Sequence, residues 1–236
     1  TGSTEISRIT MSEGDVYAQS KRLQGQKTIS IVKLDCSEVI FNEVEKQVLA
    51  KGPGEIQMDN SQVTASRAAS AGPGVDTSRP CYILVDDFDL IQWDLDKQKI
   101  VADGQKDQLK LAYIPLINNA PEKFVYVNSM RFDLYFGSDQ NGKTDLKRVY
   151  TDQGITYEEK NRTNEKTLHL ITGQTLDYDV MGKDGWVRIE GTSAVPCYVD
   201  GYRTPYALIH PATGRVETSI STQPGVMPEQ GSSKKD

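Results

Sequence analysis

The chain has little of what disulfide-rich proteins and metalloproteins need. Its 236 residues include three cysteines and two histidines. An odd number of cysteines permits at most one bridge and leaves one thiol, and none of the three has a partner at metal-ligand spacing. We therefore expect Cys36, Cys81 and Cys197 to be small apolar side chains buried in strands, because free cysteine is commonly buried.

Histidine-based catalysis has few candidates. It needs a base beside a serine or cysteine and a third group that orients the base. The alternation around His169 predicts that its ring faces solvent, opposite Leu168 and Leu170. His210 precedes a proline and a glycine-containing turn, which favours a structural role. We predict that the protein is not an enzyme.

Metal, phosphate and cofactor sites are also not indicated. The carboxylates between residues 86 and 96 lack the glycine and the final glutamate of a calcium loop. The Gly-Pro-Gly triplet at 52–54 follows a strand pattern, and no helix follows it to bind a phosphate. We read this triplet as a turn or bulge, and we expect neither a metal nor a cofactor.

Long apolar runs and blocks of like charge are absent as well. No run of 18 apolar residues occurs, so we expect no membrane-spanning helix. The net charge of -6 and the pI near 5.1 argue against nucleic acid as a partner, because a basic surface would be needed. The first residue is Thr1, which fits an added leader or a trimmed precursor. A signal or anchor segment would then lie outside this chain.

What the chain does have is a repeat. Residues 41–52 read FNEVEKQVLAKG and residues 93–104 read WDLDKQKIVADG. A looser third copy, YDVMGKDGWVRIEG, covers residues 178–191. Such self-similarity indicates one structural unit used several times, with neighbouring units covering each other's apolar faces.

The period of the pattern identifies each unit as a β-hairpin. Apolar residues alternate with polar ones on both sides of a short charged turn, and a glycine ends each copy. A further strand at 132–136 leads to Asn141-Gly142, a strong hairpin signal. Alternating runs also occupy residues 28–34, 109–113, 123–127, 148–157 and 167–172. No helix longer than about two turns is indicated. The fold class is therefore all-β and antiparallel.

Composition and periodicity divide the chain into segments. The hydrophobic fraction of 37% and the mean hydropathy of -0.52 fit a thin, extended sheet better than a thick sphere. We expect one β domain over residues 9–221, with an added or flexible segment at 1–8 and a disordered tail at 222–236. The Ser, Ala, Gly and Pro-rich stretch at 59–80 predicts a flexible insertion, and an interdomain linker is the alternative.

The order of these motifs resembles a known family. Ser12-Glu13-Gly14-Asp15-Val16, then Leu34-Asp35-Cys36, Phe41-Asn42 and the Ala-x-Gly strand ends are similar to the repeat of the OstA/LptA-like family. That family contains the periplasmic lipopolysaccharide-transport proteins. The resemblance covers most of residues 9–192 in about four imperfect copies. The chain departs from a compact member in the 59–80 insertion and in the segment from Val195 to Ser221.

The resemblance implies a taco-like β-jellyroll of two facing sheets, whose inner face holds acyl chains. Full burial of a large apolar side chain contributes about 1.5–3 kcal/mol, so a lipid tail could favourably replace water there. The same side chains could instead only pack the sheets together. The residues expected to line such a groove are Val39, Phe41, Ile91, Trp93, Phe132, Leu134, Phe136, Leu176 and Tyr178.

The resemblance also implies partners and a location. The partners would be lipopolysaccharide or another acylated amphiphile, together with edge-to-edge sheet contacts to the protein itself or to other transport proteins. The location would be the periplasm or cell envelope, in outer-membrane biogenesis. The alternative hypothesis is an envelope scaffold or adaptor that binds proteins through its sheet edges.

Overall fold

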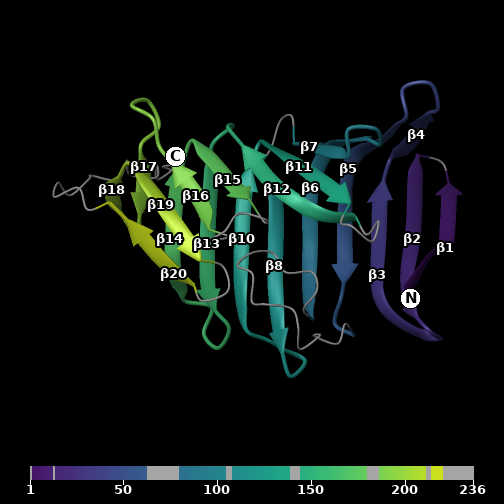
Figure 1. Cartoon of the computed structure of the whole chain (residues 1–236), viewed down its shortest axis with the longest axis horizontal. Coiled ribbons are helices and arrows are strands. Elements are labelled where there is room, and N and C mark those ends of the chain that lie inside the picture. Colours follow the sequence, from purple (N-terminus) through teal and green to yellow (C-terminus); the bar gives the residue numbers. More distant parts are fainter. Residues whose placement is uncertain are drawn as a thin grey trace, which may run out of the picture.

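The computed structural model describes residues 2–12, 14–62, 80–104, 108–138, 144–179, 186–210 and 214–219 (Figure 1). Within these ranges the chain forms 20 strands and no helix, which confirms the all-β prediction. No described segment is thus a helix able to cross a membrane. The strands are β1 (Gly2–Ser12), β2 (Asp15–Gln24), β3 (Lys27–Cys36), β4 (Glu38–Asn42), β5 (Gln47–Asp59), β6 (Cys81–Asp94), β7 (Lys99–Asp103), β8 (Leu109–Ile117), β9 (Ala120–Pro121), β10 (Lys123–Ser129), β11 (Arg131–Ser138), β12 (Thr144–Thr151), β13 (Ile155–Asn161), β14 (Thr167–Gly173), β15 (Thr175–Asp179), β16 (Val187–Glu190), β17 (Cys197–Val199), β18 (Tyr202–Thr204), β19 (Tyr206–His210) and β20 (Arg215–Thr218).

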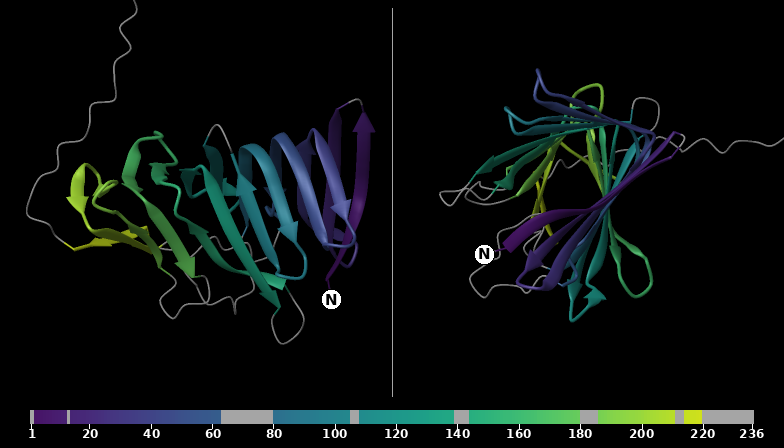
Figure 2. Two further views of the ribbon diagram at one scale, coloured as in Figure 1. Left: turned by 90° about the horizontal axis from the view of Figure 1, so that it is seen from above. Right: turned by 90° about the vertical axis from the view of Figure 1, so that its right-hand side faces the viewer.

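The strands form two facing layers, which we call the back sheet and the front sheet. The back sheet has the spatial order β1-β2-β3-β5-β6-β8-β10-β13-β14-β17-β18. The front sheet has the order β4-β5-β6-β7-β11-β12-β15-β16-β19-β20. Strands β5 and β6 belong to both sheets, and in the end-on view of Figure 2 the layers diverge on one side. This is the arrangement of two facing antiparallel sheets that the resemblance implied.

The chain passes between the sheets through very short corners. Four of them consist of a single residue: Ser37, Met130, Gln174 and Pro205. Backbone hydrogen bonds join successive corners, including Gly104 N to Met130 O at 2.9 Å and Gln174 N to Glu190 O at 2.8 Å. We call this closed side of the molecule the seam. The opposite side carries the hairpin turns of both sheets.

Small hydrogen-bond donors stabilise the seam. The last residue of β3, β10 and β18 donates in each case to the carbonyl oxygen two residues further on. The donors and acceptors are Cys36 Sγ to Glu38 O at 3.6 Å, Ser129 Oγ to Arg131 O at 3.1 Å and Thr204 Oγ1 to Tyr206 O at 2.9 Å. Each donor is buried, so these bonds satisfy backbone carbonyls where the chain leaves a sheet.

The Gly-Pro-Gly triplet lies where β5 passes from the front to the back sheet. The β5–β6 register shifts on both sides of Gly54, which confirms the predicted bulge. A Cβ atom on Gly52 would lie 1.8 Å from the carbonyl oxygen of Phe88, a residue with no exposed surface. Only glycine fits against β6 at this crossing.

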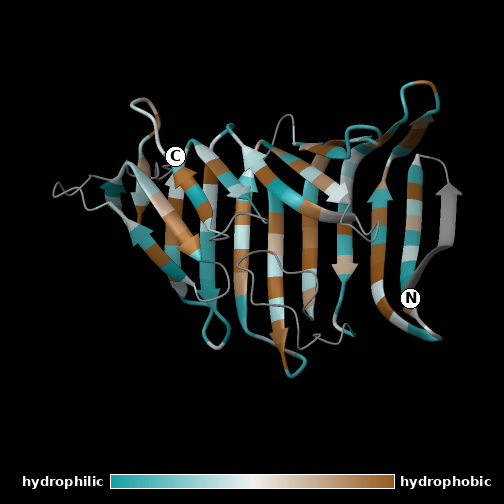
Figure 3. Cartoon of the chain, viewed as in Figure 1, coloured by the Kyte–Doolittle hydropathy of each residue, from teal (hydrophilic) through white to brown (hydrophobic). Residues whose placement is uncertain are grey.

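The repeat predicted from the sequence is present as equivalent hairpins. The hairpins β4–β5, β6–β7 and β15–β16 pair Phe41 with Val48, Trp93 with Ile100 and Tyr178 with Val187. The strand at 132–136 forms a fourth hairpin, β11–β12. Alternating hydrophobic and hydrophilic bands run along most strands in Figure 3. One face of each sheet therefore faces the interior.

The outer face of the front sheet is polar. Asp133 forms ion pairs with Lys99 at 2.6 Å and Arg131 at 2.9 Å, and Arg148 binds Asp177 with two hydrogen bonds of 2.7 and 2.6 Å. The Arg148–Asp177 pair is exposed, and exposed pairs contribute little to stability. These charged side chains keep the outer face of the front sheet exposed to solvent.

Two local expectations differ from the structure. Residues 1–8 were expected to be an added or flexible segment, whereas Gly2–Ser12 form β1, which pairs along its length with β2 and so covers the edge of β2. The run 148–157 was expected as one strand. It is divided between β12 and β13 by a corner at 152–154, where Gly154 has a φ of +79°. Glycine adopts this conformation without strain.

Other expectations fall partly or wholly outside the described residues. In the expected 59–80 insertion, Asp59 ends β5 and Cys81 begins β6, whereas residues 63–79 lie outside the described residues. The expected disordered tail at 222–236 also lies outside them. The segment from Val195 onward, which departs from the family pattern, supplies β17 to β20 and continues both sheets.

Candidate functional site

The inner face of the front sheet carries an unbroken row of apolar side chains, which we call the rim row. Direct cross-strand pairs place these residues on one face, because opposed residues in antiparallel strands share a face. In order from β4 to β20 the rim row is Phe41, Val48, Trp93, Ile100, Leu134, Val149, Tyr178, Val187, Ile209 and Val216. A hydrophobic surface thus follows the long axis of the molecule.

A second set of apolar residues lies between the rim row and the seam, two residues from it along each strand. Pairing joins Val39 to Ala50, Ala50 to Ile91, Ile91 to Ala102 and Ala102 to Phe132. Leu176 occupies the corresponding position in β15 and pairs with Ile189. The sheet register therefore brings eight of the nine expected groove residues into two parallel rows.

The ninth expected residue, Phe136, is displaced from these rows. A register shift between Tyr135 and Phe136 interrupts the β11–β12 pairing. The Phe136 backbone N–H donates to Gln98 O in the preceding hairpin turn at 2.8 Å. Its side chain is partly buried, nearer the open side than Leu134.

The back sheet presents a matching row that the sequence reasoning did not assign. Direct pairs connect Ala18, Leu34, Ile56, Val85, Leu111, Val127, Tyr157, Ile171 and Val199, which we call the back row. The alternation at 109–113 and 123–127 could have indicated it. What the sequence did not supply is the order in which these strands pair.

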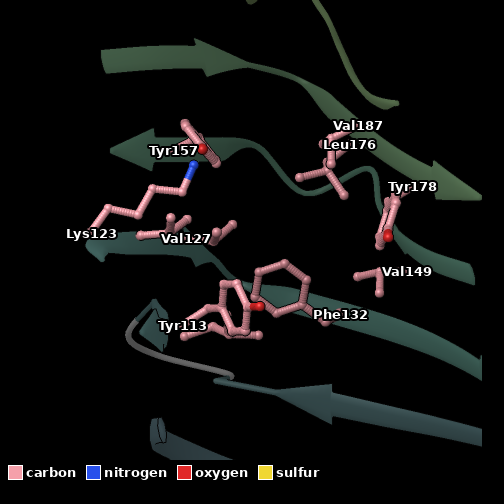
Figure 4. Close-up of a pocket in the computed structure, with 11 residues that line it drawn as sticks. Tyr113, Lys123, Val127, Phe132, Val149, Tyr157, Leu176, Tyr178 and Val187 are labelled. Carbon is pink, nitrogen blue, oxygen red and sulfur yellow. The ribbon is translucent and has the colours of Figure 1, made fainter. Parts of the chain in front are cut away.

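The two rows enclose a pocket near the middle of the molecule (Figure 4). It has a volume of about 80 Å³ and is lined by Leu111, Tyr113, Lys123, Val125, Val127, Phe132, Val149, Tyr157, Leu176, Tyr178 and Val187. Three of the nine expected groove residues, Phe132, Leu176 and Tyr178, line it. The lining is almost entirely apolar, so the pocket suits a hydrocarbon group.

Lys123 is the one charged residue of the pocket lining, and it belongs to a small polar cluster. Its Nζ lies 2.9 Å from Glu159 Oε2, and the Tyr157 hydroxyl donates to the same oxygen at 3.0 Å. In Figure 4 the Lys123 amino group points toward Tyr157. Burial, and then the Glu159 charge, raise the pKa of Tyr157 well above its usual range. The Tyr157 hydroxyl is therefore a neutral donor at physiological pH.

The expected groove residues differ in exposure. Ile91, Phe132, Leu176 and Tyr178 are buried, and Val39 and Leu134 are partly buried against the core. Phe41 and Trp93 are 57% and 43% exposed. Large exposed aromatics on a row whose other members are buried or partly buried mark a place where the sheets do not cover each other.

One further expectation was wrong. His169 was expected to face solvent opposite Leu168, but it pairs with Glu159 and shares its face with Ile171, which has no exposed surface. Leu168 lies on the other face and is exposed. His169 Nδ1 lies 3.1 Å from Asp200 Oδ2. The alternation was correct, but the assignment of its two faces was reversed.

The three cysteines are buried free thiols, as expected. Burial raises the pKa of the Cys36 thiol above its ordinary value, and burial followed by the Glu190 charge raises that of Cys197 to about 11. Raised thiol pKa values disfavour nucleophilic chemistry. Across the residues that the structure describes, no group of three or more His, Cys, Asp and Glu side chains could hold a metal ion.

Comparison with known proteins gives no relative. No protein-family model, curated protein or solved structure matches the chain.

Proposed function

We propose that the space between the two sheets is a lipid-binding groove, which carries the acyl chains of lipopolysaccharide or a similar amphiphile. The observation that carries the proposal is the rim row, a continuous apolar surface in which Phe41 and Trp93 remain exposed. Covering these side chains with an acyl chain removes apolar surface from water, which stabilises the complex by about 25 cal/mol per Å² of buried apolar surface. The pocket beside Phe132 and Tyr178 extends this surface into the interior.

The motif order of the OstA/LptA-like family supports the same proposal and adds a location. In this proposal the protein acts in the periplasm or cell envelope of a double-membraned bacterium, during outer-membrane biogenesis. It moves or holds lipid without chemical change and needs no cofactor. This part of the proposal depends on the analogy of fold and motif, since fold alone does not determine function.

The test is photo-crosslinking from position 93 in two matched variants. Ile100 pairs directly with Trp93 on the inner face, whereas its neighbour Val101 lies on the outer face and pairs with Asp133. We expect a photoreactive residue at 93 to capture an acylated amphiphile. Ile100→Asp should weaken capture, because an unpaired charge on an apolar surface is costly, and Val101→Asp should not. Circular dichroism must show that both variants are folded.

A scaffold or adaptor is the second candidate, and the free sheet edges favour it. Among the described strands, β4 pairs only with β5 and β20 pairs only with β19. Their outer edges therefore offer unpaired backbone groups to a partner strand. Capture of protein alone from position 93, by a folded variant, would reject lipid carriage and support this alternative.

A further inference from the structure

The exposure of the rim row is greatest at its N-terminal end and least at Tyr178, Val187 and Ile209, and Val216 at the β20 edge is partly buried. The exposure falls from 57% at Phe41 and 43% at Trp93 to 3% at Tyr178 and 1% at Ile209. Position relative to the sheet edge does not explain this fall. Ile209 is one strand from the β20 edge and is buried, whereas Trp93 is two strands from the β4 edge and is exposed. Among the described residues, the space between the sheets is therefore most open on the N-terminal side.

The back row changes in the same direction. Leu34, Ile56 and Val85 are partly buried, Tyr157 and Ile171 are buried, and Val199 at the end of the row is again partly buried. Beyond the pocket, the interior is filled by side chains that have no exposed surface. These residues are Ile171, Ile189, Cys197 and Ala207. Toward β4 the fully buried side chains Cys36 and Phe88 lie beside the seam, at the end of β3 and at the β5–β6 crossing.

The buried ion pair of Lys123 and Glu159 lies next to the front sheet at the C-terminal end of the groove. Gly214 precedes β20 in the front sheet, and a Cβ atom there would lie 3.0 Å from Glu159 Oε1 and 3.6 Å from Lys123 Nζ. A residue of the front sheet thus reaches the ion pair of the back sheet. Hydrocarbon passing this point would have to separate the charges, which is costly in an apolar environment.

We infer that the groove is blind: it accepts the end of a single acyl chain from the side of Phe41 and Trp93, and the chain ends in the pocket beside Phe132 and Tyr178. This inference rests on the proposed lipid-binding function, and it replaces a through-going conduit with a one-ended site. The pocket, with a volume of about 80 Å³, suits the methyl end of one chain. The polar group of the ligand stays outside, near Phe41, because its desolvation would be unfavourable.

The distance along the groove sets a preferred chain length. Trp93 and Val149 are three strand spacings apart, which corresponds to about 14 Å. Each methylene that enters should raise affinity about fourfold until the chain reaches the closed end. Carbons beyond that length should add little. A through-going groove would have no such limit.

The experiment uses palmitate carrying a photoreactive diazirine at its methyl end, with the labelled residues identified by mass spectrometry. We expect labels on Phe132, Leu176 or Tyr178 and none on Val216, which lies on the same rim row beyond the closed end. Palmitate labelled next to its carboxyl group should instead mark Phe41 or Trp93. Labels from the methyl-end probe that extend to Val216, or a reversed order of the two probes, would overturn the inference.

Two matched variants make the test independent of crosslinking chemistry. Val149→Phe reduces the pocket, so we expect palmitate to bind at least tenfold more weakly and the preferred length to shorten in a series from octanoate to stearate. Val216→Phe adds the same bulk on the same row, and it should change neither the affinity for palmitate nor the preferred chain length. Equal losses in both variants would show a through-going groove. If no fatty acid binds or labels the native protein at all, the proposed lipid-binding function fails, and this inference fails with it.

Discussion

Asn42 and Asp94 make equivalent hydrogen bonds at the start of two successive hairpin turns. Asn42 Oδ1 accepts the backbone N–H groups of Val44 and Glu45, both at 3.1 Å, and Asp94 Oδ1 accepts that of Lys97 at 2.9 Å. Asn and Asp favour such turns, because their short side chains reach the backbone two or three residues ahead. The aromatic-Asx pair of the repeat thus combines a groove side chain with the residue that starts the turn.

The first prediction concerns the turn that Asn42 starts. Asn42→Ala should lower the free energy of unfolding by about 1 kcal/mol, because two turn amides lose their acceptor. Asn42→Asp keeps an acceptor at the same place and should cost less. Urea unfolding followed by circular dichroism would measure both values. Equal losses would indicate that the side-chain acceptor is unimportant.

The second prediction is a pH dependence at the equivalent turn. The side-chain hydrogen bond from Lys97, followed by its backbone N–H, lowers the pKa of Asp94 below its usual value. A lowered folded-state pKa contributes stability above the ordinary carboxyl pKa, near 4, and that stability is lost as the pH falls through the lowered value. Asp94→Asn should therefore be less stable than the native protein at pH ~7, and the difference should shrink below pH ~4. A constant difference between these pH values would contradict this assignment.

The hairpins could be predicted from the sequence because their determinants are local. Period-2 alternation, an Asx residue and a short charged turn lie within about a dozen residues, so the copies at 41–52 and 93–104 indicated both the strands and the inner aromatics. The N-terminal strand escaped notice because it repeats no motif. Its place is decided by pairing with β2.

The back half of the groove could not be predicted, because it depends on non-local pairing. Lys123 and Glu159 are 36 residues apart and meet only when β10 pairs with β13. Nothing in either local sequence specifies that partner. His169 shows the same limit: its alternation was clear, but the face that becomes buried depends on the strand opposite.

The third prediction tests the crossing of β5 between the sheets. Gly52→Ala should destabilise the protein by more than about 3 kcal/mol, because a Cβ atom 1.8 Å from Phe88 O and 2.9 Å from Asp89 Cα must displace the backbone of β6. Gly25→Ala is the control. No atom lies within 4 Å of a Cβ there, so only its φ of +63° opposes alanine, at a cost of about 1 kcal/mol. Thermal unfolding would show which variant loses more stability. Similar losses in both variants would contradict the close approach of Gly52 to Phe88.

The fourth prediction concerns alkaline stability. The Cys197 thiol has a folded-state pKa of about 11 against an ordinary value of 9.0. A raised folded-state pKa gives stability that is present below pH ~9 and lost as the pH rises toward ~11, because the unfolded thiol ionises first. This loss amounts to about 3 kcal/mol. Cys197→Ala should remove that part of the pH dependence. Guanidinium unfolding would measure the free energy of unfolding at each pH. If this free energy falls by the same amount in Cys197→Ala as in the native protein between pH ~9 and ~11, other groups cause the loss.

The fifth prediction concerns the buried ion pair at the C-terminal end of the groove. Lys123→Met leaves the buried Glu159 carboxylate without its cation, and breaking a buried pair in this way should cost about 3–5 kcal/mol at pH ~7. In Lys123→Met/Glu159→Gln the neutral amide can still accept the Tyr157 hydroxyl hydrogen bond, so most of the loss should be recovered.

The pH dependence of the single variant separates lost charge pairing from lost packing. A buried carboxylate without its cation is costly only while it is charged, and protonation at low pH removes that charge. The deficit of Lys123→Met relative to the native protein should therefore shrink as the pH falls toward ~4, whereas the double variant should show no such change. Urea unfolding at several pH values would measure both. If the single and double variants were equally unstable at every pH, the Lys123 side chain would act through its packing, and the charge pair would not be what holds the closed end of the groove together.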